Sequence, residues 1–442
     1  MMLKPTLNAL AEALASGVLT PTDLVTEALG RAAASKAAFI ELFPSQAIAE
    51  AETATARRRA GMAFGPFDGI PFAVKDLFDV AGSVTTAGSR TRFDWPLAEA
   101  DAALIARLRQ QGLIPVGKTN LSEFAFSGLG LNPHFGTPTA RDRPDRAPGG
   151  SSSGSAVALA DGVVAFALGT DTAGSIRLPA AFNGLVGFRP SRGRYDAAGV
   201  FPLAESFDVP GPMANTVADV LILDRLMGGV SPSGKASKPP KLLLDQWLLD
   251  DVDMDSDIRS SVLAFTEQAR GCGAHVDTRP VAAVRKAGEA IRKIGWLGGV
   301  EAAAFHRERL AGADRAAIDP RVVARLDHAA AIPHIEAETL RRLRIQLRTE
   351  ISAELAGAVL VTPTTLILPP LLEPLIANDE LFARTNLQAL FITMIGSYLG
   401  MPGIALPVAR PTGALPISVL LSAAAGDDEL VLAAASWASA MR

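Results

Sequence analysis

Two glycine-rich turns restrict what this chain can fold into. Each carries a serine, and one short apolar run separates them. Residues 148–152 (PGGSS) form the first turn and residues 171–175 (DTAGS) the second, so Ser151 and Ser175 lie 24 residues apart. The run 163–168 between them has the length and apolar character of a buried strand. A small-residue turn after a buried strand can aim several backbone N–H groups at one point, as a developing oxyanion requires.

A third element, residues 69–76, places Lys75 at the end of another apolar run. Burial disfavours the charged form of an amine, so this lysine could act as a neutral base. A nucleophilic hydroxyl, a relay hydroxyl and such an amine suffice for acyl transfer without histidine or metal. A structural alternative stays open for each residue: a surface lysine, a flexible Gly/Ser linker around Ser151, and a helix cap at Ser175.

The sequence lacks the local motifs that other serine hydrolases, phosphate-binding loops and metal sites require. Ser152 fits the G-x-S-x-G pattern of an α/β-hydrolase elbow, but residues 141–146 before this turn are charged and contain proline, unlike a buried strand. The turn has no Lys-Ser or Lys-Thr after its second glycine, as a P-loop requires, and S-x-x-K is absent from the chain. Neither H-E-x-x-H nor paired cysteines occur, so we expect no metal site.

The overall composition indicates a globular protein without nucleic-acid or membrane partners. The 442 residues are 49% apolar and 20% charged, and the net charge is −4. No apolar run approaches the roughly 20 residues that span a bilayer, and the N-terminus lacks the apolar core of a secretory signal. The single cysteine, Cys272, excludes an internal disulfide. We therefore expect a cytoplasmic protein.

Hydrophobic periodicity predicts an α/β fold. The first 60 residues are predicted as helices, one of them capped by Thr20, and Asp101 is predicted to cap a helix over 101–112. Short apolar runs between amphipathic helices favour a sheet covered on both faces. The predicted strands cover residues 113–116, 163–168 and 359–362.

The same patterns suggest one domain with an insertion. N-terminal helices (1–60) precede a core (61–230) that contains both serine turns. The polar, proline-rich segment 231–240 marks a boundary, and residues 231–350 are predicted as a mostly helical insertion. Residues 351–442 are expected to return to the same α/β domain.

The elements around Lys75, Ser151 and Ser175 resemble the amidase signature family, which includes fatty acid amide hydrolases, indole-acetamide hydrolases and glutaminase subunits of tRNA-dependent amidotransferases. The resemblance runs from about residue 60 to 230 and resumes near residues 361, 399 and 426. It implies the amidase-signature fold, a central mixed β-sheet with helices on both faces. The chain is most similar to plant-type indole-acetamide hydrolases and related bacterial amidases.

The resemblance also implies a role for each catalytic candidate. Ser175 would be the acyl nucleophile, Ser151, preceded by a cis peptide bond, the proton relay, and Lys75 the base. The oxyanion hole would consist of the backbone N–H groups of Thr172, Ala173, Gly174 and Ser175. Ala173 stands where the family usually has glycine, which bears on the acyl specificity more than on the reaction type.

Neighbouring residues are expected to support this site. Asp171 and Arg177 bracket Ser175 and would brace its turn, and Ser152 would hydrogen-bond nearby. Asp76 would raise the pKa of Lys75 if it faced the amine, so we expect it to point toward a backbone or arginine partner. An apolar acyl pocket is predicted to be lined by Phe124, Phe126, Leu129 and Leu131.

The predicted activity is hydrolysis of a small apolar or aromatic carboxylic amide to acid and ammonia, without metal or cofactor. One alternative within the family is a partner-dependent enzyme, either the glutaminase subunit of a tRNA-dependent amidotransferase or a biuret-type hydrolase. An alternative of another class is a non-catalytic scaffold that retains the fold. The expected partner is a small-molecule amide, and a homodimer is an alternative to a monomer.

Overall fold

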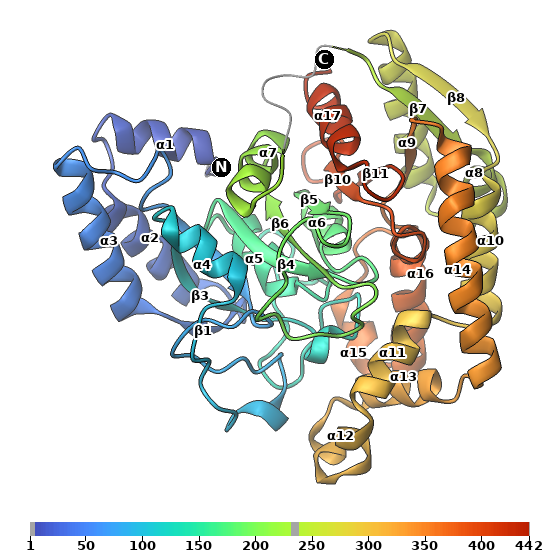
Figure 1. Ribbon diagram of the computed structural model, residues 1–442, viewed down its shortest axis with the longest axis horizontal. Coiled ribbons are helices and arrows are strands. Elements are labelled where there is room, and N and C mark those ends of the chain that lie inside the picture. The colour runs from blue at the N-terminus through green and yellow to red at the C-terminus, as the bar shows by residue number, and fades with distance from the viewer. Residues whose placement is uncertain (1–4, 231–237, 442) are drawn as a thin grey trace.

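The fold is built on one large sheet that passes through the whole molecule (Figure 1). The computed structural model describes residues 5–230 and 238–441, so most of the predicted boundary segment 231–240 lies outside the described residues. The order of the eleven strands is β1-β3-β2-β4-β6-β5-β10-β11-β9-β7-β8. They are β1 (Phe39–Leu42), β2 (Pro71–Lys75), β3 (Ile114–Thr119), β4 (Phe166–Asp171), β5 (Val186–Arg189), β6 (Val209–Ala214), β7 (Lys241–Asp245), β8 (His275–Arg279), β9 (Val359–Pro363), β10 (Gly403–Pro407) and β11 (Ser418–Ser422).

Parallel and antiparallel pairs both occur in this sheet. Strand β2 runs parallel to β3 and β4, whereas β4 runs antiparallel to β6. At the other end, β7 runs parallel to β8 and β9. The predicted α/β class and mixed sheet are therefore confirmed.

Helices pack against the sheet and at its ends. In Figure 1, α1, α2 and α3 lie at the left end, and α8, α9, α10 and α14 lie at the right end. The α-helices are α1 (Leu7–Ala15), α2 (Pro21–Ala34), α3 (Pro44–Arg59), α4 (Ala103–Gln110), α5 (Ser153–Ala160), α6 (Arg177–Asn183), α7 (Val217–Met227), α8 (Gln246–Asp251), α9 (Ser256–Gly271), α10 (Ala282–Lys293), α11 (Leu297–Phe305), α12 (Arg307–Ala311), α13 (Pro320–Ala330), α14 (His334–Leu355), α15 (Leu372–Ala377), α16 (Asp379–Tyr398) and α17 (Asp428–Ala438). Short 3₁₀ helices are η1 (Arg90–Arg92), η2 (Glu123–Ala125) and η3 (Ala313–Ala317).

Strand side chains alternate between two hydrophobic clusters, as expected for a sheet buried on both faces. In β7, Leu242 and Leu244 belong to one cluster and Leu243 to the other. In the neighbouring strands β2 and β4, the rings of Phe72 and Phe166 stack with their centroids 5.1 Å apart. This packing fixes the two strands whose carboxyl ends carry Lys75 and the Ser175 turn.

Two predicted segments contain strands that the sequence analysis missed. The N-terminal 60 residues, predicted as helices alone, include β1, which pairs with β3. The segment predicted as a mostly helical insertion contributes β7 and β8 to the sheet. Strand β8 is an edge strand whose side chains are largely exposed, so it lacks the apolar pattern that identifies a strand.

The ends of some helices and strands also differ from the prediction. Thr20 caps α2 in a capping box with Asp23, as the sequence suggests. Asp101 does not cap α4; its carboxylate accepts a hydrogen bond from the Ala81 N–H at 2.8 Å and lies 3.1 Å from Arg109 Nε. Strand β4 begins and ends three residues later than the predicted strand 163–168. Polar residues at its C-terminal end belong to the strand because their side chains form buried hydrogen bonds.

No helix of the described residues is long and apolar enough to cross a membrane.

Candidate active site

Lys75 lies at the carboxyl end of β2 and is fully buried. Because β2 is parallel to β4, its last residue lies beside the end of that strand. The Lys75 Nζ is 2.7 Å from Ser151 Oγ and 2.8 Å from Thr170 Oγ1. Two residues of the predicted triad are thus in direct contact, and the sequence analysis missed Thr170.

The surroundings of Lys75 favour its neutral form. Burial lowers the pKa of Lys75 to about 7, although the carboxylates of Asp171 and Asp208 act in the opposite direction. Asp76, the next residue, points away as predicted, but its cationic partner is a lysine rather than an arginine. Its carboxylate lies 2.8 Å from Lys118 Nζ and accepts a hydrogen bond from the Thr86 N–H at 3.1 Å.

The loop before α5 holds Ser151, which is fully buried. The Gly150–Ser151 peptide bond is cis, as the family resemblance implies. The Gly150 N–H donates to the Gly128 carbonyl at 2.7 Å. Gly149 has a φ of +74°, and a Cβ there would lie 2.8 Å from the Pro179 backbone, so only glycine fits.

Ser175 lies on the turn from β4 to α6 and is 5% exposed. Its carbonyl accepts a hydrogen bond of 3.3 Å from the N–H of Ser152, the residue after Ser151. The two serine turns are thereby brought together. The described residues include no hydrogen-bond partner for the Ser175 hydroxyl, so the proton path from Ser175 to Ser151 is not closed in this structure.

The Ser175 turn leaves a set of backbone donors free. Within the described part of the chain, no acceptor receives the N–H groups of residues 172–175. Gly174 has a φ of +142°, and a Cβ there would lie 2.1 Å from Thr393 Oγ1 on α16. Ala173, the residue before that glycine, is partly exposed. The turn therefore has the free donors that an oxyanion site needs.

Asp171, at the end of β4, is paired with two arginines and accepts a hydrogen bond of 3.2 Å from the Ile176 N–H across the turn. Its carboxylate accepts two hydrogen bonds of 2.9 Å from Arg177, and the Arg189 Nη1 lies 3.1 Å away. Burial by itself would raise the pKa of Asp171, but the two guanidinium groups outweigh it and hold that pKa well below its usual range. Arg189 was missed as a site residue, although it lies in a segment of family resemblance.

Other side chains hold the ends of these turns. The Ser152 hydroxyl lies 3.4 Å from the Thr170 carbonyl oxygen, which supports its predicted role near the site. The buried carboxylate of Asp208, which the sequence did not reveal, accepts a hydrogen bond of 2.6 Å from the Thr172 hydroxyl.

The four residues predicted to line an acyl pocket do not gather in one place. Phe126 lines a cavity of about 770 Å³ beside α16. Phe124 is fully buried and its ring centroid lies 4.5 Å from that of His306. Leu129 and Leu131 belong to a core cluster with Leu178 and Phe182. Phe126 alone of the four lines this cavity, and an apolar sequence pattern does not distinguish a pocket wall from core packing.

The cavity beside Phe126 is linked to the Ser151 loop by hydrogen bonds. Asn386 lies on its wall, and the Asn386 Oδ1 accepts a hydrogen bond of 2.7 Å from the Gly128 N–H. Gly128 in turn accepts the hydrogen bond from Gly150. A second cavity, of about 840 Å³, touches Thr170 and Thr172 from another side.

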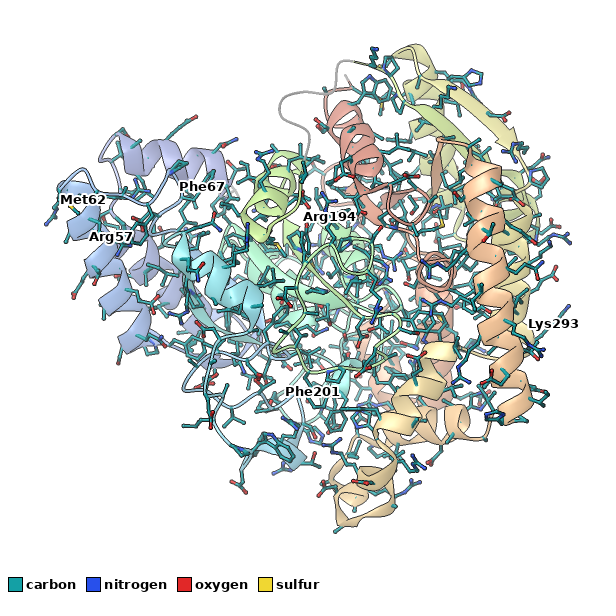
Figure 2. The ribbon with its side chains drawn as sticks, viewed as in Figure 1. Arg57, Met62, Phe67, Arg194, Phe201 and Lys293 are labelled. Carbon is teal, nitrogen blue, oxygen red and sulfur yellow. The ribbon has the colours of Figure 1, made fainter. Side chains whose placement is uncertain are left out.

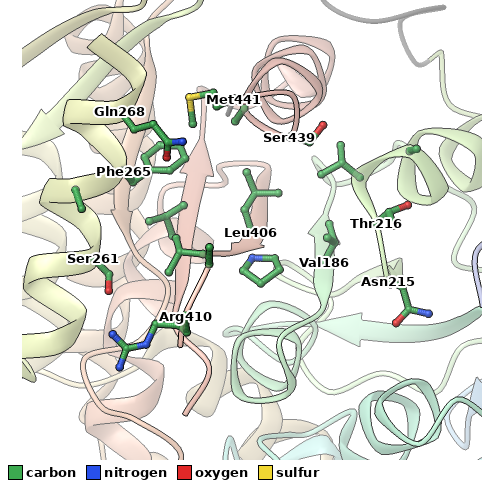
Figure 3. Close-up of a pocket in the computed structure, with 18 of the residues that line it drawn as sticks. Val186, Asn215, Thr216, Ser261, Phe265, Gln268, Leu406, Arg410, Ser439 and Met441 are labelled. Atoms are coloured by element: carbon green, nitrogen blue, oxygen red, sulfur yellow. The ribbon is translucent and has the colours of Figure 1, made fainter. Parts of the chain in front are cut away.

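A third cavity lies apart from these groups. Figure 3 shows it between α9, α17 and β10, with Phe265, Leu406 and Met441 on its walls. None of the three triad candidates lines any of these three cavities, but this one also lacks the residues that contact their loops, Thr170, Thr172 and Asn386. Among the described residues, no cluster of side chains suited to bind a metal occurs.

Fold and site together define an amide hydrolase of the α/β type. The family model described as Amidase matches residues 23–432, and the chain belongs to that family. A relative from Comamonas testosteroni, 2-amino-5-chloromuconic acid deaminase, is 35% identical over 388 residues, which cover 82% of this chain and 79% of the relative. A glutamyl-tRNA(Gln) amidotransferase subunit from Chloroflexus aurantiacus is 42% identical over 53% of this chain and 48% of its own.

Solved structures agree with this assignment along nearly the full chain. A crystal structure of an amidase has a TM-score of 0.87 and 32% identity, and the match covers 98% of this chain and 99% of that one. A peptide amidase in complex with chymostatin has a TM-score of 0.81 and 27% identity over 99% and 98% of the two chains.

Proposed function

We propose that this chain hydrolyses a small carboxylic amide through Ser175, Ser151 and Lys75, without metal or cofactor. The observation that carries the proposal is the 2.7 Å contact between Lys75 Nζ and Ser151 Oγ in a fully buried site. Because burial lowers the pKa of Lys75 to about 7, a substantial fraction of the amine is neutral at neutral pH and can accept a proton.

In the proposed reaction, Lys75 accepts a proton from the Ser151 hydroxyl while Ser151 accepts one from Ser175. The Ser175 oxygen attacks the amide carbon, and the free N–H groups of residues 172–175 stabilise the resulting oxyanion. Ser151 then protonates the nitrogen of this tetrahedral intermediate, the C–N bond breaks, and ammonia leaves while the acyl group remains on Ser175 as an ester. Water attacks the ester carbon, the relay runs again, and the acid leaves.

The cavity beside Phe126 is proposed as the acyl site. Its walls include the apolar side chains of Trp296, Phe391 and Met394, and it adjoins the loop that holds Gly150. Burying an apolar acyl group gains about 25 cal/mol per Å², so an arylacetamide would gain several kcal/mol there. This supports the apolar or aromatic acyl group expected from the sequence.

The first test is activity of the purified single chain. We expect it to hydrolyse an arylacetamide with a higher kcat/KM than glutamine or biuret, with and without EDTA. A serine-directed fluorophosphonate should label Ser175, as peptide mapping would show. A label on Ser152 instead would favour the α/β-hydrolase elbow, and a folded chain with neither label nor turnover would favour the scaffold.

A partner-dependent enzyme is the second candidate. It is favoured by the similarity to the glutamyl-tRNA(Gln) amidotransferase subunit, although that match spans only about half of each chain. Activity that appears only with a further polypeptide, or preference for glutamine or biuret, would support this candidate against the single-chain amidase.

A further inference from the structure

Arg325, on α13, is half-buried and lines the cavity beside Phe126. Its Nη1 atom is buried and has no hydrogen-bond partner. Among the described residues, no carboxylate forms an ion pair with it. Asp253 lines the same cavity but is exposed and makes no such contact.

Within the described ranges, the close partner of this guanidinium is an aromatic ring. Its Cζ lies 4.7 Å from the Phe126 ring centroid, which gives a cation–π contact. That contact uses the face of the guanidinium, so the buried Nη1 keeps its in-plane N–H groups without an acceptor. Burial lowers the pKa of Arg325 to about 10, so the group still carries its charge at neutral pH. A buried donor without a partner is costly, and an anion in the cavity would supply the missing acceptor.

The other cations around this cavity are placed differently. Arg292 is exposed, and its Cζ lies 4.2 Å from the centroid of the Phe391 ring. The Lys293 Nζ is 3.8 Å from a Glu289 carboxylate oxygen, and Figure 2 shows Lys293 at the outer edge of the molecule. Arg325 is therefore the cation with buried, unused donors among these three.

The walls of the cavity connect Arg325 to the catalytic loops. Phe126, which contacts Arg325, lies two residues before Gly128, and Gly128 holds the Gly150–Ser151 segment by a hydrogen bond. Asn386 lies on the same wall and is hydrogen-bonded to Gly128. A molecule in this cavity would thus have apolar walls around its middle, a guanidinium on one wall and, on another, Asn386, which is hydrogen-bonded to the segment that holds the Ser151 loop.

We propose that Arg325 binds a carboxylate on the acyl part of the substrate, at the end remote from the amide. This inference rests on the proposed amidase function and narrows its substrate to an amide with an apolar middle and an anionic end. Guanidinium and carboxylate match in geometry, because two parallel N–H groups can donate to two oxygens. A neutral apolar amide would leave those donors unpaired.

The first experiment compares matched amides on the wild-type chain. Glutaramate, adipamate and 4-carboxyphenylacetamide would each be paired with a neutral amide in which a methyl ketone replaces the carboxylate. We expect kcat/KM to favour the carboxylate by about 10- to 100-fold for at least one pair, the range of a charge-assisted hydrogen bond. Equal or better turnover of the neutral amide in every pair would overturn the inference and leave the amidase function standing.

The second experiment compares two arginines on the same cavity. Arg325→Met should reduce the carboxylate preference of the best pair to near one, and Arg325→Lys should retain part of it. Arg292→Met, the matched control, should keep the preference. Rates would be expressed per site labelled by fluorophosphonate, and thermal unfolding would check the fold. An equal loss in both methionine variants would indicate a general effect of positive charge and refute a specific role for Arg325.

A binding measurement keeps the inference separate from catalysis. In the Ser175→Ala background, calorimetry would measure the Kd of glutarate, adipate and 4-carboxyphenylacetate, the dicarboxylate products of the three amides. We expect Arg325→Met to weaken the binding of at least one by about 10- to 100-fold. If no dicarboxylate binds, or if binding is insensitive to Arg325, the inference fails whether or not the chain is an amidase.

Discussion

Lys75 occupies a position where a charged amine is costly, so its replacement should affect stability and activity in opposite directions. The lysine is fully buried, and burial is the main reason that its pKa falls from 10.5 to about 7. Lys75→Met keeps a chain of similar length and removes the amine. We expect turnover to fall by at least about 10³-fold, toward the upper end of general-base contributions or beyond, because the relay loses its proton acceptor.

The stability effect has a sign and a pH dependence that follow from linkage. Between about pH 7 and 10.5 the unfolded chain binds more protons at this residue than the folded chain, so the free energy of unfolding rises with pH. A difference of one in pKa between the unfolded and the folded chain corresponds to about 1.4 kcal/mol. Burial of this amine therefore costs the folded wild type about 4 kcal/mol of stability at pH 7. Near pH 9 the cost falls to about 2 kcal/mol.

Removing the amine also removes hydrogen bonds. The hydroxyls of Ser151 and Thr170 lose their contacts of 2.7 and 2.8 Å, at a cost of about 1–3 kcal/mol that is the same at both pH values. The pH-dependent part therefore isolates the lysine. The stability of Lys75→Met relative to wild type should decrease by about 2 kcal/mol between pH 7 and pH 9.

Urea unfolding followed by tryptophan fluorescence at pH 7, 8 and 9 would measure this difference. Lys118→Met is the matched comparison, because Lys118 is also fully buried but lies 2.8 Å from the Asp76 carboxylate. Its loss leaves a buried carboxylate alone and should destabilise the fold by about 3–5 kcal/mol. A stability difference for Lys75→Met that does not change with pH, or near-normal activity in that variant, would refute the proposed state of Lys75.

Three further outcomes are expected at the same site. The kcat/KM of the wild type should rise with pH through about 7 and then level off, because only neutral Lys75 accepts the proton; a flat pH–rate profile would contradict this. Gly174→Ala should lower kcat by about 10²–10³-fold without loss of fold, because its Cβ would lie 2.1 Å from Thr393 Oγ1 and displace the N–H donors; steady-state kinetics and circular dichroism would check this. Asp171→Asn should destabilise the chain by about 3–5 kcal/mol in urea unfolding, since Arg177 and Arg189 lose their shared carboxylate; unchanged stability would argue against a bracing role.

The sequence was informative where a residue type occurs in only a few structural or chemical roles. Glycines and serines in two short turns, with a lysine after an apolar run, marked the candidate residues, and the family resemblance implied the contact between Lys75 and Ser151. Three buried strands, β3, β4 and β9, also followed from their apolar runs, although β4 begins three residues later than predicted, and the buried strands β5, β6, β10 and β11 were not predicted. These features depend on local chemistry, which a sequence displays directly.

The missed features depend on contacts between distant segments. Thr170 and Asp208 are ordinary residues in the sequence and gain their roles only when β4 lies beside β2 and against a later loop. Asn386 and Arg325 come from helices far along the chain, with no local pattern that marks them. Conversely, Leu129 and Leu131 looked like pocket residues because core and pocket share the same composition.

The contact between Gly174 and α16 has a consequence for how activity arises during synthesis. The chain reaches Ser175 before half of it has been translated, yet Thr393 and Leu390, which pack on Gly174, are added about 200 residues later. At about 5–20 residues per second, this interval lasts roughly 10 to 40 seconds. A nascent chain would therefore carry the three proposed catalytic side chains for that time without the helix that packs on the Ser175 turn, so competence for the proposed hydrolysis would emerge only with the last quarter of the polypeptide.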